Sequence, residues 1–171
     1  MKIHKLFFLF LLLTSGAVAQ DIYVPDFLSG KFTQTREIKE AGITLKSEGS
    51  FSIHKTKGIK WTVEKPFQHT ILISPDAVVE GGEIAKQLAS IMGGLLVQDL
   101  QALQKFFEVK QTIRGDGFEM NLKTTDETIA KVFSEIIIKG RKYVDSAILF
   151  NQQGDKTTIN FSNLRESAED F

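Results

Sequence analysis

Within residues 50–66 (SFSIHKTKGIKWTVEKP), apolar and polar residues alternate over 50–54 and again over 59–64, on either side of a lysine-rich turn. A period of two places successive side chains on opposite faces of a β-strand, so this stretch predicts two strands that each carry one apolar face. The turn between them, Lys-Thr-Lys-Gly, ends at Gly58, which adopts a positive φ at little cost. We therefore expect a hairpin whose apolar side chains are Phe51, Ile53, Ile59, Trp61 and Val63.

Similar patterns, bounded by turn-forming residues, predict further strands on both sides of this hairpin. A short helix is expected over residues 126–132, and the charged tail over residues 165–171 is expected to fray. The predicted strands span residues 27–37, 43–54, 58–65, 69–74, 77–80, 106–114, 118–123, 134–139, 144–150 and 157–162.

The period changes to that of a helix between residues 83 and 107. Adjacent glycines inside a helix each cost about 1 kcal/mol relative to alanine, so Gly93-Gly94 predicts a break between two helices. The apolar residues recur at spacings of three and four, and they are Ile84, Leu88, Ile91, Met92, Leu95, Leu96, Leu100, Leu103 and Phe107.

Nine or ten short strands with one helical insertion predict a mainly β fold of the α+β class. We expect an antiparallel sheet that curls, with the helices laid against one face. Residues of one parity on consecutive strands form that apolar face: Leu45, Phe51, Ile53, Ile59, Trp61, Val63, Ile71 and Ile73. The helical residues Leu88, Ile91, Met92, Leu95 and Leu96 form a stripe that covers it. Periodicity does not distinguish a filled core from a hollow one, so both interpretations remain open.

The amino terminus has the order of features found in secretory signal peptides. Lys2 and Lys5 precede an unbroken apolar run over residues 6–13, and Ala17-Val18-Ala19 forms a small-x-small cleavage site. The run is shorter than the roughly 20 residues that span a bilayer. We expect cleavage after Ala19 and export, so residues 1–19 are the signal peptide and residues 20–171 form a single domain.

Composition supports neither a disulfide framework nor a nucleic-acid partner. The chain has no cysteine, and its 21 basic residues equal its 21 acidic residues in number. No catalytic residue, metal ligand or cofactor site is predicted, because His54 and His69 belong to no metal or nucleophile motif. Gly115-Asp116-Gly117 lacks the strand-to-helix setting of a phosphate loop and is interpreted as a hairpin turn.

Several short motifs, taken in order, resemble the LolA family of periplasmic outer-membrane lipoprotein carriers. The resemblance covers most of residues 27–163. Its motifs are Phe32-Thr33-Gln34-Thr35-Arg36, Gly49-Ser50-Phe51, Ile59-Lys60-Trp61, Lys65-Pro66, Ile71-Leu72-Ile73-Ser74, Tyr143-Val144-Asp145-Ser146 and Asn160-Phe161-Ser162-Asn163.

Two features depart from the main form of that family. Where the carriers continue with a tryptophan-rich hairpin after Val79, this chain has the helical stretch 83–107, which resembles the shorter LolA-like proteins associated with polyene-lipid biosynthesis. The arginine that the resemblance implies as a lid latch corresponds to Lys55. Lysine keeps the charge but lacks the planar five-donor fork, so the same latch does not follow.

The resemblance implies a strongly curved, incomplete antiparallel β-barrel, covered by a helical lid around an apolar cavity that holds cargo. It also implies a monomeric periplasmic carrier that binds the acyl chains of lipoproteins or lipids without catalysis. Such a carrier would receive cargo from an inner-membrane donor and pass it to an outer-membrane acceptor. Two alternatives stay open: a protein-binding β-sheet chaperone of the cell envelope that uses an exposed edge strand, and a lipid hydrolase.

Overall fold

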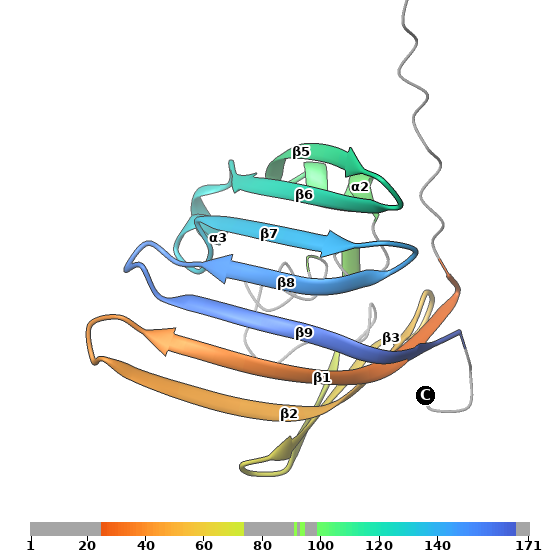
Figure 1. Cartoon of the computed structure of the whole chain (residues 1–171), viewed down its shortest axis with the longest axis horizontal. Coiled ribbons are helices and arrows are strands. Elements are labelled where there is room, and N and C mark those ends of the chain that lie inside the picture. Colours follow the sequence, from red (N-terminus) through yellow and green to blue (C-terminus); the bar gives the residue numbers. More distant parts are fainter. Residues whose placement is uncertain (1–24, 74–90, 92, 95–98, 167–171) are drawn as a thin grey trace, which may run out of the picture.

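The computed structural model describes residues 25–73, 91, 93–94 and 99–166, in which nine strands form one antiparallel sheet. Figure 1 shows the sheet with two short helices beside it. The strands are β1 (Phe27–Ile38), β2 (Ile43–His54), β3 (Gly58–Lys65), β4 (His69–Ile73), β5 (Phe107–Arg114), β6 (Gly117–Thr124), β7 (Glu135–Gly140), β8 (Val144–Phe150) and β9 (Lys156–Arg165). The helices are α2 (Leu100–Gln104) and α3 (Glu127–Ala130).

The sheet consists of two meanders that meet at the ends of the chain. Its strand order is β4-β3-β2-β1-β9-β8-β7-β6-β5, so every neighbouring pair except β1–β9 is consecutive in the sequence. The pairing of β1 with β9 therefore joins the two meanders into one sheet. It places Phe32 opposite Phe161 and Gln34 opposite Ile159.

The sheet is curved, and β3 and β4 run at a steep angle to β1 and β2 (Figure 1). The register between β2 and β3 shifts between Glu48 and Gly49, and that between β1 and β9 shifts between Ser29 and Lys31. Such bulges increase the local twist and bend a strand. The structure thus confirms a mainly β fold built on a curved, open antiparallel sheet, whereas an enclosed cavity and a helical lid stay predictions.

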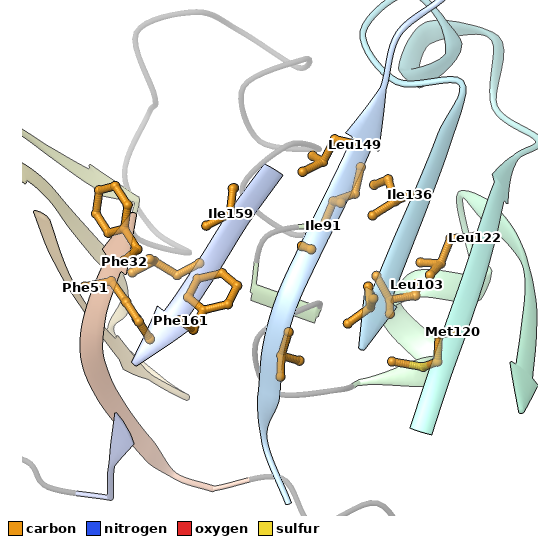
Figure 2. Close-up of a cluster of buried hydrophobic side chains, with 14 of the residues drawn as sticks. Phe32, Phe51, Ile91, Leu103, Met120, Leu122, Ile136, Leu149, Ile159 and Phe161 are labelled. Carbon is orange, nitrogen blue, oxygen red and sulfur yellow. The ribbon is translucent and has the colours of Figure 1, made fainter. Parts of the chain in front are cut away.

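One hydrophobic core lies against one face of the sheet. Alternation in β6 and β7 buries every second side chain, including Met120, Leu122, Ile136 and Ile138, each with 0% exposure. Figure 2 shows side chains from the two meanders pointing into the same region, with Leu103 of α2 and Ile91 among them. The core therefore crosses from one meander to the other and does not stop at the β1–β9 pair.

Aspartates begin both short helices. Asp99 accepts a hydrogen bond from the Ala102 amide at 3.0 Å, and Asp126 accepts from the amides of Thr128 and Ile129 at 2.8 and 2.9 Å. These caps satisfy amides that have no partner within the helix, and they direct Leu103 and Ile129 into the core. Within the described part of the chain, no helix is long and apolar enough to cross a membrane.

The strand predictions match the structure closely, and the helix predictions match less well. Gly93 and Gly94 are helical, so the break is not at this pair; a non-helical described residue, Asp99, separates them from α2 and caps that helix. Packing explains the difference, because an added Cβ at Gly94 would lie only 3.2 Å from the Leu103 side chain. The helical pattern predicted up to residue 107 stops earlier, because α2 ends at Gln104 and Phe107 begins β5. At the other end of the chain, Arg165 was expected to fray but belongs to β9. Residues 1–19 and the strand predicted over 77–80 lie outside the described residues.

Asp155 connects the turn after β1 to the turn before β9. Its carboxylate accepts hydrogen bonds from the Lys39 amide and the Asn151 side chain, each at 3.0 Å, and lies 3.7 Å from the Arg36 guanidinium. The Lys39 amide contributes most to holding the pKa of Asp155 below its ordinary value. A carboxyl group with a lowered pKa stabilises the folded state above its unfolded pKa of about 3.9 and loses that effect as the pH falls.

We expect Asp155→Asn to lower the Tm at pH 7, because the neutral amide places an N–H against donors that now face a carboxylate. The deficit should shrink as the pH falls below about 4, where the wild-type carboxyl group is itself protonated. Thermal unfolding followed by circular dichroism from pH 2 to pH 7 measures both effects. Asp116→Asn, which removes the same charge from the exposed β5–β6 turn, is the control. A deficit that is constant with pH would refute the role given to the ionised carboxylate.

Candidate functional site

Two rows of apolar side chains cross the first meander on one face of the sheet. Phe51, Trp61 and Ile71 lie directly opposite one another on β2, β3 and β4. Ile53, Ile59 and Ile73 form the next row. Directly opposed residues of antiparallel strands share a face. We call this face of the sheet the inner face and the opposite face the outer face.

The inner face continues without interruption across the second meander. Phe32 of β1 lies opposite Phe161 of β9, and the rows then pass through β8, β7 and β6. The residues that continue it are Ile159, Ala147, Leu149, Ile138, Ile136, Met120 and Leu122. All of them are buried.

Four rings form an aromatic cluster where the meanders meet: Phe32, Phe51, Trp61 and Phe161. Trp61 stacks on Phe32 with ring centroids 4.0 Å apart and on Phe51 at 5.9 Å. Phe161 meets Phe51 edge to face at 5.5 Å. Such geometries each add about 0.5–1.5 kcal/mol beyond the burial of area. The rings come from β1, β2, β3 and β9, so their packing holds these four strands together where the sheet curves.

Two glycines allow this close packing. A Cβ at Gly30, which lies opposite Phe51, would meet the Leu164 side chain at 2.7 Å and the Phe51 ring at 3.1 Å. At Gly49 a Cβ would lie 1.9 Å from the Thr62 carbonyl oxygen. The first glycine makes room for the aromatic cluster, and the second lets β3 approach β2 at the bulge.

The inner face is sealed toward β6–β8 and open toward β4. At the sealed end, Leu103 and Ile129 of the helices are fully buried with the strand residues beneath them. At the other end Ile71 of β4 is 47% exposed. Trp61 and Ile73 are half-buried between the two ends. An apolar face with an exposed end has the character of a binding surface, because monomeric proteins rarely expose contiguous apolar area without use for it.

Helical residues bridge the two ends of the inner face. Ile91 is 1% exposed. A Cβ at Gly93 would lie 3.5 Å from the Ile59 side chain, and a Cβ at Gly94 would lie 3.2 Å from Leu103. The backbone at these positions therefore runs between β3 and α2, over the inner face. That the helical stretch forms a lid over this face stays a prediction.

The residues predicted to line a cavity fall into three groups in the structure. Phe51, Ile53, Ile59, Val63 and Ile91 are buried, and Trp61 and Ile73 are half-buried. Leu45 shares the inner face but lies past the last β2–β3 pair, Glu48 with Lys65, so neither β3 nor β4 flanks it. Leu88, Met92, Leu95 and Leu96 lie outside the described residues. That these residues bind cargo stays a prediction.

The sequence interpretation missed half of the aromatic cluster. Phe32 and Phe161 were read only as parts of motifs, although Phe32 has the parity of Leu28 and Phe161 that of Ile159, and all four are buried. The alternation of positions within each strand could have placed Phe32 and Phe161 on the apolar face. It does not identify the neighbouring strand, so the meeting of β1 with β9 could not be inferred from it.

Lys55 lies in the β2–β3 turn and contacts the residue that precedes β1. Its ammonium lies 3.7 Å from the Asp26 carboxylate, with both side chains mostly exposed, and its amide donates to the Asp26 carbonyl at 2.9 Å. An exposed ion pair of this kind contributes little, roughly 0–1 kcal/mol. The contact fixes the turn to the start of β1, and the latch role stays a prediction.

The histidines of the described region serve turns. The Nδ1 atom of His54 accepts hydrogen bonds from the amides of Thr56 and Lys57 at 3.1 and 3.3 Å. His69 contacts the Phe67 carbonyl at 3.1 Å. Among the described residues, no three histidine, cysteine or acidic side chains are grouped so that they could hold a metal ion.

Comparison with known families gives one match that covers most of the chain. The family model described as outer membrane lipoprotein carrier protein LolA matches residues 26–170. No curated protein matches the chain.

Solved structures give distant similarities. A domain described as an outer membrane lipoprotein-sorting protein from Vibrio parahaemolyticus is 9% identical, with a TM-score of 0.33, over 81% of this chain and 84% of its own. A LolA superfamily protein from Nitrosomonas europaea is 9% identical, with a TM-score of 0.32, over 84% of this chain and 88% of its own. A DUF1329 family protein from Desulfovibrio piger is 12% identical, with a TM-score of 0.31, over 86% and 88%.

We expect Gly49→Ala to destabilise the protein by about 1–3 kcal/mol or more, because the added methyl group overlaps the Thr62 carbonyl and the strands must separate. Urea unfolding measures the change. Ser47→Ala, two residues away on the same strand, should change stability by less than about 0.5 kcal/mol. Equal stability of the Gly49 and Ser47 variants would mean that the close approach at the bulge is not required.

Proposed function

The chain belongs to the LolA family of outer membrane lipoprotein carrier proteins, and on that basis we propose that it is a periplasmic carrier of acyl chains. It holds the acyl chains of lipoproteins or lipids against the inner face and ferries them from the inner to the outer membrane. No catalytic step is involved. The observation that carries this proposal is the apolar inner face, which is buried over β6–β8 and exposed at Ile71 of β4.

Burial of apolar area supplies the affinity. Each methylene group moved from water to an apolar surface contributes about 0.8 kcal/mol, so part of one acyl chain suffices for useful binding. The chain enters at Ile71 and Ile73 and extends toward the aromatic cluster, where Trp61 is still half-exposed. Beyond that cluster the inner face is filled by its own side chains, so the described part of the face limits how much of an acyl chain it accepts.

Release follows from the same packing. Trp61 stacks on Phe32 and Phe51, and Ile91 is buried against the core. An acyl chain that displaces such contacts loses part of the free energy that its own burial provides. The net affinity is therefore moderate, and an acceptor that binds the acyl chain more tightly unloads the carrier.

Cargo identity and exchange partners complete the proposal. The sequence of residues 83–107 resembles that of LolA-like proteins associated with polyene-lipid biosynthesis, which supports lipid cargo besides lipoproteins. An inner-membrane donor loads the carrier and an outer-membrane acceptor unloads it, and the protein acts as a monomer in the periplasm. Lys55 holds its turn to Asp26 at the start of β1.

We expect brominated acyl chains to quench the fluorescence of Trp61, the single tryptophan of the chain. A titration with brominated fatty acid should give saturable quenching, because bromine quenches only on contact and Trp61 lies on the inner face. Ile71→Asp should weaken binding by about tenfold or more, since it removes an apolar contact worth roughly 1.5–3 kcal/mol and adds a charge.

Leu72→Asp is the matched control, because Leu72 is the next residue of β4, lies on the outer face and is 59% exposed. It should bind the acyl chain within about twofold of the wild type. Native mass spectrometry of gently purified protein should show co-purified lipid. Absence of both lipid and saturable quenching would refute the carrier proposal, and stable capture of a protein partner by such lipid-free protein would favour the β-sheet chaperone instead. Turnover of ester substrates would refute the claim that no catalysis occurs.

A further inference from the structure

The outer face of the first meander carries a polar groove that the carrier proposal does not use. The groove has a volume of about 360 Å³ and lies on β1, β2, β3 and β9. Volumes of this size are typical of sites for small molecules. Its lining residues are Ser29, Gly30, Lys31, Ser50, Phe51, Ser52, Lys60, Thr62, Asn163 and Arg165.

The strand register builds the groove as a row of hydroxyl groups between two cations. Arg165 lies opposite Ser29, Ser29 opposite Ser52, and Ser52 opposite Lys60. A second row, parallel to the first, runs from Lys31 through Ser50 to Thr62. Arg165 and Lys60 are three strand spacings apart, about 14 Å, and both line the groove from its two sides.

A bulge in β9 brings Arg165 and Asn163 to this position. The β1–β9 register shifts between Ser29 and Lys31, and Asn163 has a positive φ of 54°. Two residues of β9 thus oppose Gly30, so that Leu164 packs against the inner face while Asn163 lines the groove on the other side. A regular strand would leave these side chains on the opposite faces.

The charges of the groove are not balanced within the described part of the chain. Lys31 is neutralised by Glu64, which lies 3.1 Å away at the margin. Lys60 and Arg165 form no ion pair or side-chain hydrogen bond with any described residue. The groove therefore carries two uncompensated positive charges.

Ser29 adds an independent indication of a ligand. Its side chain is 4% exposed and lines the groove, and its hydroxyl group bonds to no described residue. A buried hydroxyl without a partner costs about 1–3 kcal/mol, and such groups are uncommon in folded proteins. A ligand that accepts a hydrogen bond in the groove would remove this cost.

We propose that this groove is a binding site for a phosphate group, either of a phospholipid headgroup or of a soluble phosphate ester. A phosphate carries a charge of about −1.5 to −2 and three acceptor oxygens, which matches the Lys60 and Arg165 cations, unpaired among the described residues, and the Ser29 hydroxyl. The Arg165 fork binds two of these oxygens, and the Ser29 hydroxyl and the Lys60 ammonium reach the others. A lone carboxylate would leave some of these donors unused. The site lies on the face opposite the acyl-binding surface, so it does not depend on the cargo proposal.

The test uses the full chain in phosphate-free buffer. Nuclear magnetic resonance or calorimetric titrations with inorganic phosphate, glycerol phosphate and acetate are compared with co-sedimentation on vesicles that contain phosphatidylglycerol or only phosphatidylcholine. Saturable binding of either free phosphate compound identifies a soluble ligand, and binding only to the anionic vesicles identifies a lipid headgroup; either result supports the site.

The double variant Lys60→Gln/Arg165→Gln should bind phosphate or anionic vesicles at least about tenfold more weakly. Arg114→Gln/Lys123→Gln is the matched control, because it removes the same charge from exposed positions on the outer face of β5 and β6. It should stay within about twofold of the wild type. Ser29→Ala should also weaken binding while leaving the Tm equal or higher, since it deletes a buried hydroxyl that has no partner among the described residues.

Three results would overturn the assignment. Absence of binding to both phosphate compounds and to anionic vesicles would remove the site. If the two double variants lose the same affinity for phosphate, the binding reflects only the net positive charge of the protein and not a specific site. Binding of acetate or of an acidic peptide as tightly as phosphate would make it a carboxylate site. Acyl-chain binding should be unchanged in the groove variants, so failure of this site and failure of the carrier proposal give different results.

Discussion

The pairing of β1 with β9 is the constraint on which the rest of the molecule depends. It connects residues 27–38 with residues 156–165 and turns two meanders into one sheet. Bringing the two ends of the chain together has an entropic cost that local hairpins do not have, so other contacts must offset it. The aromatic cluster does so, because Phe32, Phe161 and Trp61 pack across this junction. Asp155 adds polar contacts between the neighbouring turns.

The same junction gives the sheet two faces of different character. On the inner face it joins the apolar rows of both meanders, which are buried at the β6–β8 end and exposed at Ile71 at the β4 end. On the outer face it brings Arg165 next to Ser29 and completes a basic groove. The bulge in β9 serves both faces, because it sends Leu164 to the core and Asn163 to the groove. A carrier of amphipathic molecules gains from having an apolar surface and an anion site on one rigid sheet.

Local patterns predicted the positions of the strands well, but they did not predict which strands that are distant in the sequence pair with each other. Alternation between residues 50 and 66 placed Phe51, Trp61 and Val63 on one face, and the register agrees, because side-chain direction within a strand depends only on parity. The role of Phe32 and Phe161 depended on which strands pair across the whole chain, which no local period encodes. Gly93 and Gly94 are helical despite their low helix propensity, and the helix packs closely at Gly94, where an added Cβ would lie 3.2 Å from the Leu103 side chain. The groove was missed because its residues come from four strands.

The face on which an acyl chain lies can be measured directly by photo-crosslinking. An acyl chain with a diazirine along its methylene groups is bound, irradiated and mapped onto the protein by tandem mass spectrometry. Strand β4 alternates between the faces, so adjacent residues of one peptide report on opposite sides. A carrier that uses the inner face should give adducts at Ile71, Ile73 and Trp61 and none at Leu72. Adducts at Leu72 and Lys60, or adducts scattered over both faces, would show that the inner face is not the acyl-binding surface.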